Sequence, residues 1–341
     1  MDVYRKKYSA YRDFLSVALF IAFFAKLTSG PVVRANKFID QLNEEHHVSL
    51  KNLETGIQIV AVGLFKKMVL ADHLSVFVDD VFGAPKAFSG FTVLFAIISY
   101  ALQIYFDFAG YSDIAIGIAK ILGYDLDKNF DLPYASLNPT EFWKRWHITL
   151  SSWLQEYLYY PLGGNRKGKI RTYINLFLTM LIGGLWHGAN WTFVIWGAIN
   201  GMALVVHKIF LKWKVDKFGS RDAGNKFWKT VSGILTFVFV CICWVFFRAS
   251  SVGNAFDVFG SVFNTVGITQ IYSWAILAVV IAAAEIIVAI VKKKKREGKI
   301  ISRYIILDLS KLLPLALFFA FVGITAILAY LGDTSFIYGK F

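Results

Sequence analysis

The chain has 341 residues, of which 57% are hydrophobic and 17% are aromatic, and its formal net charge is +13. Soluble domains hold about 45–50% apolar residues, so the composition and several long apolar runs indicate an all-α, polytopic integral membrane protein. The basic residues cluster in short loops between these runs, as in the cytoplasmic loops of membrane proteins. Membrane orientation therefore explains the charge, and we expect a lipid bilayer rather than nucleic acid as the partner.

The first three apolar runs lead to different predictions. Residues 14–27 follow a polar segment and precede no small-residue cleavage pattern, so we expect a first spanning helix. Residues 57–70 contain Lys66 and Lys67, which suits either a tilted span or a helix at the interface. Residues 91–108 form a clear span that leads into Asp107 and Asp113. We expect a broken helix there, with both aspartates in capping or turn positions rather than lining a polar channel.

A helix start signal follows, because Asn138, Pro139 and Glu141 suit the N-cap, N1 and N3 positions. Continued to about residue 158, this helix carries Trp143, His147 and several leucines on or near one stripe. We expect one amphipathic helix, interfacial or re-entrant, that presents His147 on its apolar face.

Five further spans are predicted, at residues 173–185, 193–211, 231–247, 274–291 and 312–331. The glycine-rich basic loop 163–171 lacks the ending of a P-loop, so a cytoplasmic turn is a better interpretation than a phosphate cradle. Basic residues after two of the spans and the nearly uncharged connection 249–269 give a self-consistent orientation from residue 161 onward.

The stretch 186–191 separates two of the predicted spans and contains polar residues. His187 and Asn190 stand where one span ends and the next begins, with Gly188 between them. Polar groups at membrane depth are costly and usually functional, and irregular backbone there needs protein or a water-filled cavity around it. We expect a helix break with His187 facing a cavity; an interfacial anchor of the aromatic belt is the alternative.

These residues allow a simple chemistry. A neutral histidine can remove a proton from a hydroxyl that attacks a carbonyl carbon, which makes His187 a candidate general base. We find no serine or cysteine nucleophile motif and no cluster with metal-ligand spacing, so we predict direct attack and no metal. His147 is either catalytic or orienting, or simply packed; Asn190 either stabilises an oxyanion or caps the next helix. Glu285, alone in an apolar run, is expected to face the protein interior and pair with a basic group.

Several segments resemble one family in the expected order. They are residues 30–34, 105–113, 141–153, 159–165, 183–191 and 336–338. Together they resemble the membrane-bound O-acyltransferases, and in particular the bacterial alginate O-acetylase branch, which is related to the D-alanyl transfer protein of teichoic acid synthesis. The resemblance covers essentially the whole chain.

The resemblance implies a role for several residues. His187 matches the near-invariant histidine taken as the catalytic base, and His147 matches the second histidine of this branch. Trp186 and Asn190 fall in the same motif as His187, and Asp113 and Trp143 fall in two others. We expect these four residues to contribute to substrate binding.

The resemblance also implies an architecture and partners. The implied fold is a ring of tilted and broken transmembrane helices around a central funnel, with donor and acceptor reaching one histidine from opposite faces. We expect no bound cofactor, an acyl thioester such as acetyl-CoA as the donor, and an exported polysaccharide or an acyl-accepting SGNH-type protein as the partner. The implied location is the bacterial cytoplasmic membrane, crossed several times.

Residues 1–341 are expected to form a single membrane domain. Relatives usually carry several additional apolar spans before the segment that matches residues 1–5, so we expect this domain to lack those helices. Two other functions fit the same polar break: an acyl-group conduit or transporter, and a non-catalytic scaffold of a polysaccharide modification complex. Against a transporter, the sequence contains no paired, repeat-related broken helices.

Overall fold

The structure, a computed structural model, describes residues 1–27, 30–44, 49–219, 224–293, 304 and 306–332. Within these ranges the regular structure is helical, apart from one isolated bridge between Phe88 and Ile268. The predicted all-α class is confirmed. The motif at 336–338 and part of the basic run 292–296 lie outside the described residues.

The chain divides into two compact units. Unit 1 holds residues 1–69, 107–128 and 296–340, and unit 2 holds residues 70–106, 129–295 and 341. The expected single domain over residues 1–341 stays a prediction, and each unit is described by itself.

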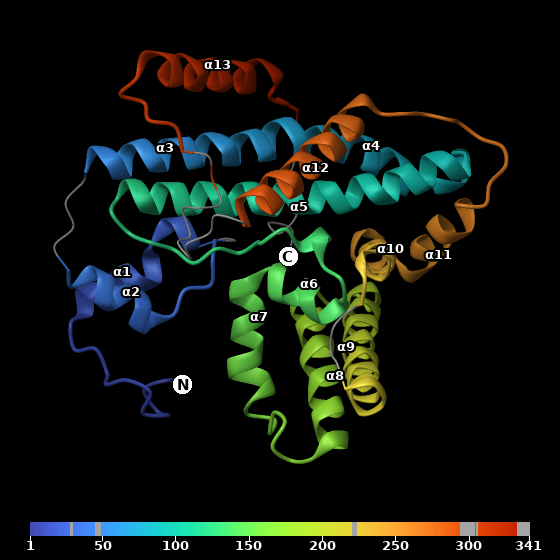
Figure 1. The fold of residues 1–341 in the computed structure, drawn as a ribbon, viewed down its shortest axis with the longest axis horizontal. Helices are drawn as coiled ribbons and strands as arrows, with labels where there is room; N and C mark the ends of the chain where they lie inside the picture. Colours follow the sequence, from blue (N-terminus) through green and yellow to red (C-terminus); the bar gives the residue numbers. More distant parts are fainter. Residues whose placement is uncertain (28–29, 45–48, 220–223, 294–303, 305, 333–341) are drawn as a thin grey trace. The chain divides into compact units, whose positions relative to one another are not determined.

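Unit 1 is built on two helices that pass each other closely. Its elements are α1 (Phe14–Ala22), η1 (Phe24–Lys26), α2 (Ala35–Leu42), α3 (Leu50–Leu64), the start of the π-helix η2 (Phe65–Ala71), the end of α5 (Gly90–Ile121) and α13 (Leu312–Leu328) (Figure 1). A Cβ on Gly63 would lie 2.7 Å from the carbonyl oxygen of Gly110, and one on Gly117 would lie 2.7 Å from that of Gly56. Glycines thus allow the backbones of α3 and α5 to approach, as at many membrane helix crossings.

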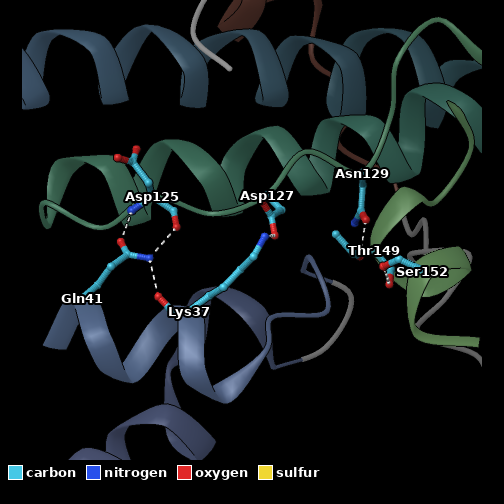
Figure 2. A network of polar contacts seen from close by, with 7 residues as sticks. All are labelled: Lys37, Gln41, Asp125, Asp127, Asn129, Thr149 and Ser152. Carbon is cyan, nitrogen blue, oxygen red and sulfur yellow. Dashed lines mark hydrogen bonds and ion pairs between the residues drawn. The ribbon is translucent and has the colours of Figure 1, made fainter. Parts of the chain in front are cut away.

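Polar contacts fasten α2 to the segment after α5 (Figure 2). Lys37 Nζ lies 2.9 Å from Asp127 Oδ2, and the Gln41 amide donates to the Asp125 carbonyl oxygen at 3.1 Å. In return, the backbone N–H of Asp125 donates to Gln41 Oε1 at 2.8 Å.

One predicted span in unit 1 is wrong. The run 14–27 contains only the nine-residue helix α1 before the chain turns into η1. Nine residues at about 1.5 Å each cover less than half of a hydrocarbon core about 30 Å thick. The lysines in 57–70, by contrast, do not end the helix, because η2 continues α3 through them.

Unit 2 contains most of the remaining helices. They are α4 (Asp72–Gly83), η3 (Pro85–Ala87), the start of α5, η4 (Pro133–Ala135), α6 (Pro139–Arg145), α7 (Ile148–Leu154), the π-helix η5 (Gln155–Tyr159), α8 (Lys169–Trp186), α9 (Trp191–Phe218), α10 (Lys226–Arg248), α11 (Val252–Ser261) and α12 (Ser273–Lys293). Helices α8 and α9 run side by side as a hairpin (Figure 1).

Helices occupy the other predicted spans. Among the described residues, α5, α9 and α10 are long and apolar enough to cross a membrane, and 273–287 and α13 are shorter apolar helices. The predicted span 173–185 lies within α8. The predicted break at Asp107 and Asp113 is wrong, because α5 continues through both from Gly90 to Ile121.

Candidate active site

His187 lies between two helices, as predicted. Helix α8 ends at Trp186, α9 begins at Trp191, and residues 187–190 connect them. Gly188 has φ +152°, and a Cβ there would lie 2.9 Å from the Phe193 ring, so the turn needs a glycine. Asn190 Oδ1 accepts from the backbone N–H of Thr192 at 3.0 Å, which caps α9.

The Asn190 amide also donates to the carbonyl oxygen of Ser250 at 3.2 Å. The capping alternative for Asn190 is therefore confirmed, and its expected contact with substrate stays a prediction. The same side chain links the α8–α9 connection to the segment that follows α10. This hydrogen bond helps to hold residues 187–190 in position.

Aromatic rings surround the imidazole of His187, which is buried. Trp196 and Phe247 meet it edge-on, with ring centroids 5.3 Å and 5.2 Å away, and Trp186 lies at 5.2 Å. Burial lowers the pKa of His187 to about 4. The ring is therefore uncharged at neutral pH, which is the state that a general base requires.

Trp196 contributes a polar group to this apolar site. Its indole N–H is buried and finds no hydrogen-bond partner within the described part of the chain. A buried donor without a partner costs roughly 1–3 kcal/mol. This group was not singled out from the sequence, because Trp196 is there one more apolar residue of a predicted span.

The α8–α9 hairpin that carries His187 is unusually tight. A Cβ on Gly197 would lie 2.6 Å from the carbonyl oxygen of Met180, and one on Gly184 would collide with the carbonyl oxygen of Phe193. Glycines therefore set the distance between the two helices, and with it the position of the connection at His187.

His147 marks a second break, which corrects one prediction. Asn138 does cap the helix, since its Oδ1 accepts from the Glu141 N–H at 2.8 Å, but α6 ends at Arg145 and α7 begins only at Ile148. His147 itself has φ +42° and ψ +54°. This left-handed conformation costs a non-glycine residue roughly 1–2 kcal/mol, so the single helix through residue 158 is wrong.

His147 is buried, and its environment keeps it neutral. Burial, and secondarily the electrostatic effect of His187, lowers the pKa of His147 to about 3. Its Nδ1 lies 3.3 Å from Asn129 Oδ1. The same oxygen accepts from the Thr149 hydroxyl at 2.5 Å, a contact that Figure 2 shows. The side-chain amide of Asn129 is therefore one partner of this buried ring, and the choice between a packed and a catalytic or orienting His147 stays a prediction.

A chain of packed indole rings connects the two histidine segments. Trp143 meets Trp196 edge-on at 5.7 Å and donates its indole N–H to Asn200 Oδ1 at 3.3 Å. Trp196 also stacks on Trp244 at 6.1 Å, and Trp244 packs against Trp146 at 4.9 Å. The structure therefore brings Trp143, Trp186, His147, His187 and Asn190 into one unit.

A cavity of about 1000 Å³ opens beside Trp143. Trp143 and Ile148 line it, together with residues of α7, η5, α8 and α9; the described lining includes neither His147 nor His187. Four lysines and one aspartate also line it, namely Lys144, Lys169, Lys208, Lys212 and Asp216. The Lys212 ammonium, within hydrogen-bonding range, lowers the pKa of Lys169. Such a cluster of positive charge suits an anionic group.

Asp113 belongs to unit 1 and has protein partners. Its Oδ2 lies 3.1 Å from Lys66 Nζ, and its Oδ1 accepts from the Tyr304 hydroxyl at 2.6 Å. Asp107 pairs with Lys67 at 2.7 Å. The expected capping and turn roles are wrong, since both aspartates form ion pairs inside α5, and the expected substrate contact of Asp113 stays a prediction.

Two further expectations concern charge. Glu285 accepts a hydrogen bond from the Tyr105 hydroxyl at 2.8 Å, and its expected pairing with a basic group stays a prediction. Among the residues that the structure describes, no group of three His, Cys, Asp or Glu side chains could hold a metal ion.

Comparison with known proteins gives consistent matches. The family model of membrane-bound O-acyltransferases matches residues 5–253. A probable alginate O-acetylase AlgI of Pseudomonas putida is 42% identical over 264 residues, which cover 77% of this chain and 52% of that protein. A peptidoglycan O-acetyltransferase of Helicobacter pylori is 41% identical over 258 residues, 75% of this chain and 48% of that protein.

A more distant match extends the same comparison. A teichoic acid D-alanyltransferase of Bacillus subtilis is 28% identical over 233 residues, which cover 65% of this chain and 58% of that protein. The chain spans about half the length of the O-acetyltransferases that it matches.

Proposed function

Because this chain belongs to the membrane-bound O-acyltransferase family, we propose that it transfers an acetyl or similar acyl group to hydroxyls of an exported polysaccharide, with His187 as the general base. The observation that carries the proposal is the buried, uncharged imidazole in the connection between α8 and α9.

The proposed step needs one base. His187 takes the proton of the acceptor hydroxyl while that oxygen attacks the carbonyl carbon of the thioester. The C–O bond forms, negative charge gathers on the carbonyl oxygen, and the C–S bond then breaks. The imidazolium returns the proton to the departing thiolate, so an ester and a thiol leave and the ring is neutral again.

The developing oxyanion needs a hydrogen-bond donor in a site that excludes water. The indole N–H of Trp196 is the donor that we propose, because it is buried, lies on a ring that contacts His187 and has no hydrogen-bond partner within the described residues. An oxyanion accepts this hydrogen bond only as the reaction proceeds, so the interaction favours the transition state over the ground state.

The donor site that we propose is the cavity between α6, α7, η5, α8 and α9. Its apolar wall suits the acyl and thioester end of the donor, and its lysines suit the phosphates of a donor such as acetyl-CoA. Trp143 lies both on this cavity and against Trp196, so it stands between the proposed donor site and the base.

The names of the relatives support the acceptor that we propose, and the basic loop supports the location. The relatives are named for acetylation of alginate and of peptidoglycan and for D-alanylation of teichoic acid, so we propose an exported glycan, reached directly or through an SGNH-type partner protein. We place the chain in the bacterial cytoplasmic membrane, with the basic loop 163–171 on the cytoplasmic side.

The test measures ester-linked acetate on exported glycan in the bacterial host. We compare the intact gene, a deletion, and the deletion complemented with His187→Ala or with His73→Ala. His73 is the matched control, because its ring stacks on Trp274 at 3.8 Å. We expect acetate to disappear in His187→Ala with normal membrane levels and to persist in His73→Ala. If acetate persists in His187→Ala, His187 is not the general base, and a conduit or scaffold function is favoured.

A further inference from the structure

The break at His147 is paired with a distant segment of the same unit. The backbone N–H of Ile148 donates to the carbonyl oxygen of Asn129 at 2.9 Å, and the N–H of Asp131 donates to that of Arg145 at 2.9 Å. Residues 129–131 therefore run beside residues 145–148. They bind the last residue of α6 and the first residue of α7, on either side of the left-handed His147. These main-chain hydrogen bonds on both sides of His147 fix the position of its backbone, from which the imidazole projects.

The side chain of Asn129 acts on the imidazole itself. Its Oδ1 lies 3.3 Å from His147 Nδ1. It also accepts from the Thr149 hydroxyl at 2.5 Å (Figure 2). All three residues are buried, with 1%, 5% and 3% of Asn129, His147 and Thr149 exposed. A carbonyl oxygen only accepts hydrogen bonds, so the histidine nitrogen that it contacts carries the proton.

We propose that Asn129 is a positioning residue that holds His147 in the Nδ1-protonated tautomer. In a neutral imidazole one nitrogen donates and the other accepts, and the hydrogen bond at one nitrogen determines the state of the other. Asn129 therefore makes Nε2 of His147 an acceptor. The Thr149 hydroxyl donates to the same oxygen, which orients the amide with its oxygen toward the ring.

The neutral amide of Asn129 affects the charge of the His147 imidazole differently from a carboxylate at the same position. A carboxylate beside Nδ1 stabilises the imidazolium and raises the pKa of the histidine. Asn129 sets the same tautomer without that charge, so the ring stays an uncharged acceptor. The catalytic consequence rests on the function proposed above: Nε2 of His147 is then able to accept a hydrogen bond from the acyl-accepting hydroxyl, as a second base or an orienting group beside His187.

The tautomer is tested by nitrogen NMR on the whole chain in lipid bilayers, with histidine labelled by ¹⁵N in its ring. The His147 signal is identified by its loss in His147→Gln. We expect a protonated Nδ1 and an unprotonated Nε2 in the wild type, and a shift of the proton to Nε2 in Asn129→Leu. The matched control is Asn175→Leu, because Asn175 is equally buried but its amide donates to the Gly164 carbonyl oxygen.

Three results decide the proposal. It is overturned if wild-type His147 carries its proton on Nε2, if Asn129→Leu keeps the wild-type pattern, or if Asn175→Leu alters it equally. Should Asn129→Leu not fold, the isosteric Asn129→Asp decides, because it keeps an acceptor oxygen and must retain the protonated Nδ1.

Kinetics separate positioning from folding. In Asn129→Leu we expect kcat of acetyl transfer to fall by at least about tenfold, and KM for the donor to change by less than about twofold. This fall is smaller than the roughly 10²–10⁴-fold that a general acid or base itself contributes, because Asn129 acts only through His147. An unchanged kcat, or a fall matched by Asn175→Leu, contradicts a positioning role. If the wild type transfers no acetyl group at all, the proposed function is wrong. The NMR experiment still tests the tautomer of His147, because it does not depend on activity.

Discussion

The tight α8–α9 hairpin gives a prediction whose size follows from the structure. In Gly197→Ala, the new Cβ would lie 2.6 Å from the Met180 carbonyl oxygen, whereas ordinary contacts begin near 3.4 Å. The two helices must therefore separate by about 0.8 Å at this point. Trp196 precedes the substituted position and touches His187, so the base moves relative to its surroundings.

A displacement of about 1 Å in a catalytic arrangement can cost about 10²-fold in rate, and overpacking typically costs roughly 1–3 kcal/mol of unfolding free energy. We expect Gly197→Ala to lose activity by between tenfold and about 10²-fold, measured as acetyl transfer in proteoliposomes, and to unfold at a lower temperature in detergent.

The matched control is Gly183→Ala at the same hairpin. Its Cβ would meet only the Leu154 Cδ1 methyl, at 3.3 Å, and that methyl can move. We expect activity within about twofold of the wild type, since alanine also favours the helix over glycine by up to about 1 kcal/mol. Equal losses in Gly183→Ala and Gly197→Ala, or no loss in either, refute the argument from backbone approach.

Three further predictions address the ion pair, the pH dependence and the helix cap. Lys66→Met leaves the Asp113 carboxylate buried without this partner, so unfolding free energy should fall by roughly 3–5 kcal/mol, and the double variant with Asp113→Leu should recover most of it in thermal unfolding. Because burial lowers the pKa of His187 to about 4, kcat/KM should be flat from pH 6 to 8 and fall only as protonation removes the base toward pH 4; a midpoint near 6.5 contradicts this. Asn190→Ala should cost about 1 kcal/mol through the lost cap of α9, and an unchanged melting temperature argues against the cap.

The sequence predicted most of the helices and the break at His187, because long apolar runs and local glycines report directly on both. It also placed the N-cap at Asn138, where the signal is local. It did not predict that α6 ends before His147, since the pairing with Asn129 that compensates the left-handed backbone joins positions 18 apart. Hydrophobic periodicity carries no information about such a contact.

The prediction for the aspartates of α5 failed for a related reason. Charged residues inside an apolar run predicted a break, but Lys66 and Lys67 in a π-helix provide partners that let α5 continue. The two lysines were visible in the sequence, and only the pairing between segments remained hidden. The short α1 shows the opposite error, since an apolar run of adequate length need not be helical throughout.

The rate of acetyl transfer by His187→Gln tests the central claim most directly. The purified full chain, at equal incorporation into proteoliposomes, receives acetyl-CoA labelled in the acetyl group and a soluble glycan acceptor, and ester-linked label is counted. We predict a fall of at least about 10²-fold, the lower end of what a general base contributes. A His187→Gln rate within about threefold of the wild type would contradict the assignment of this imidazole as the base.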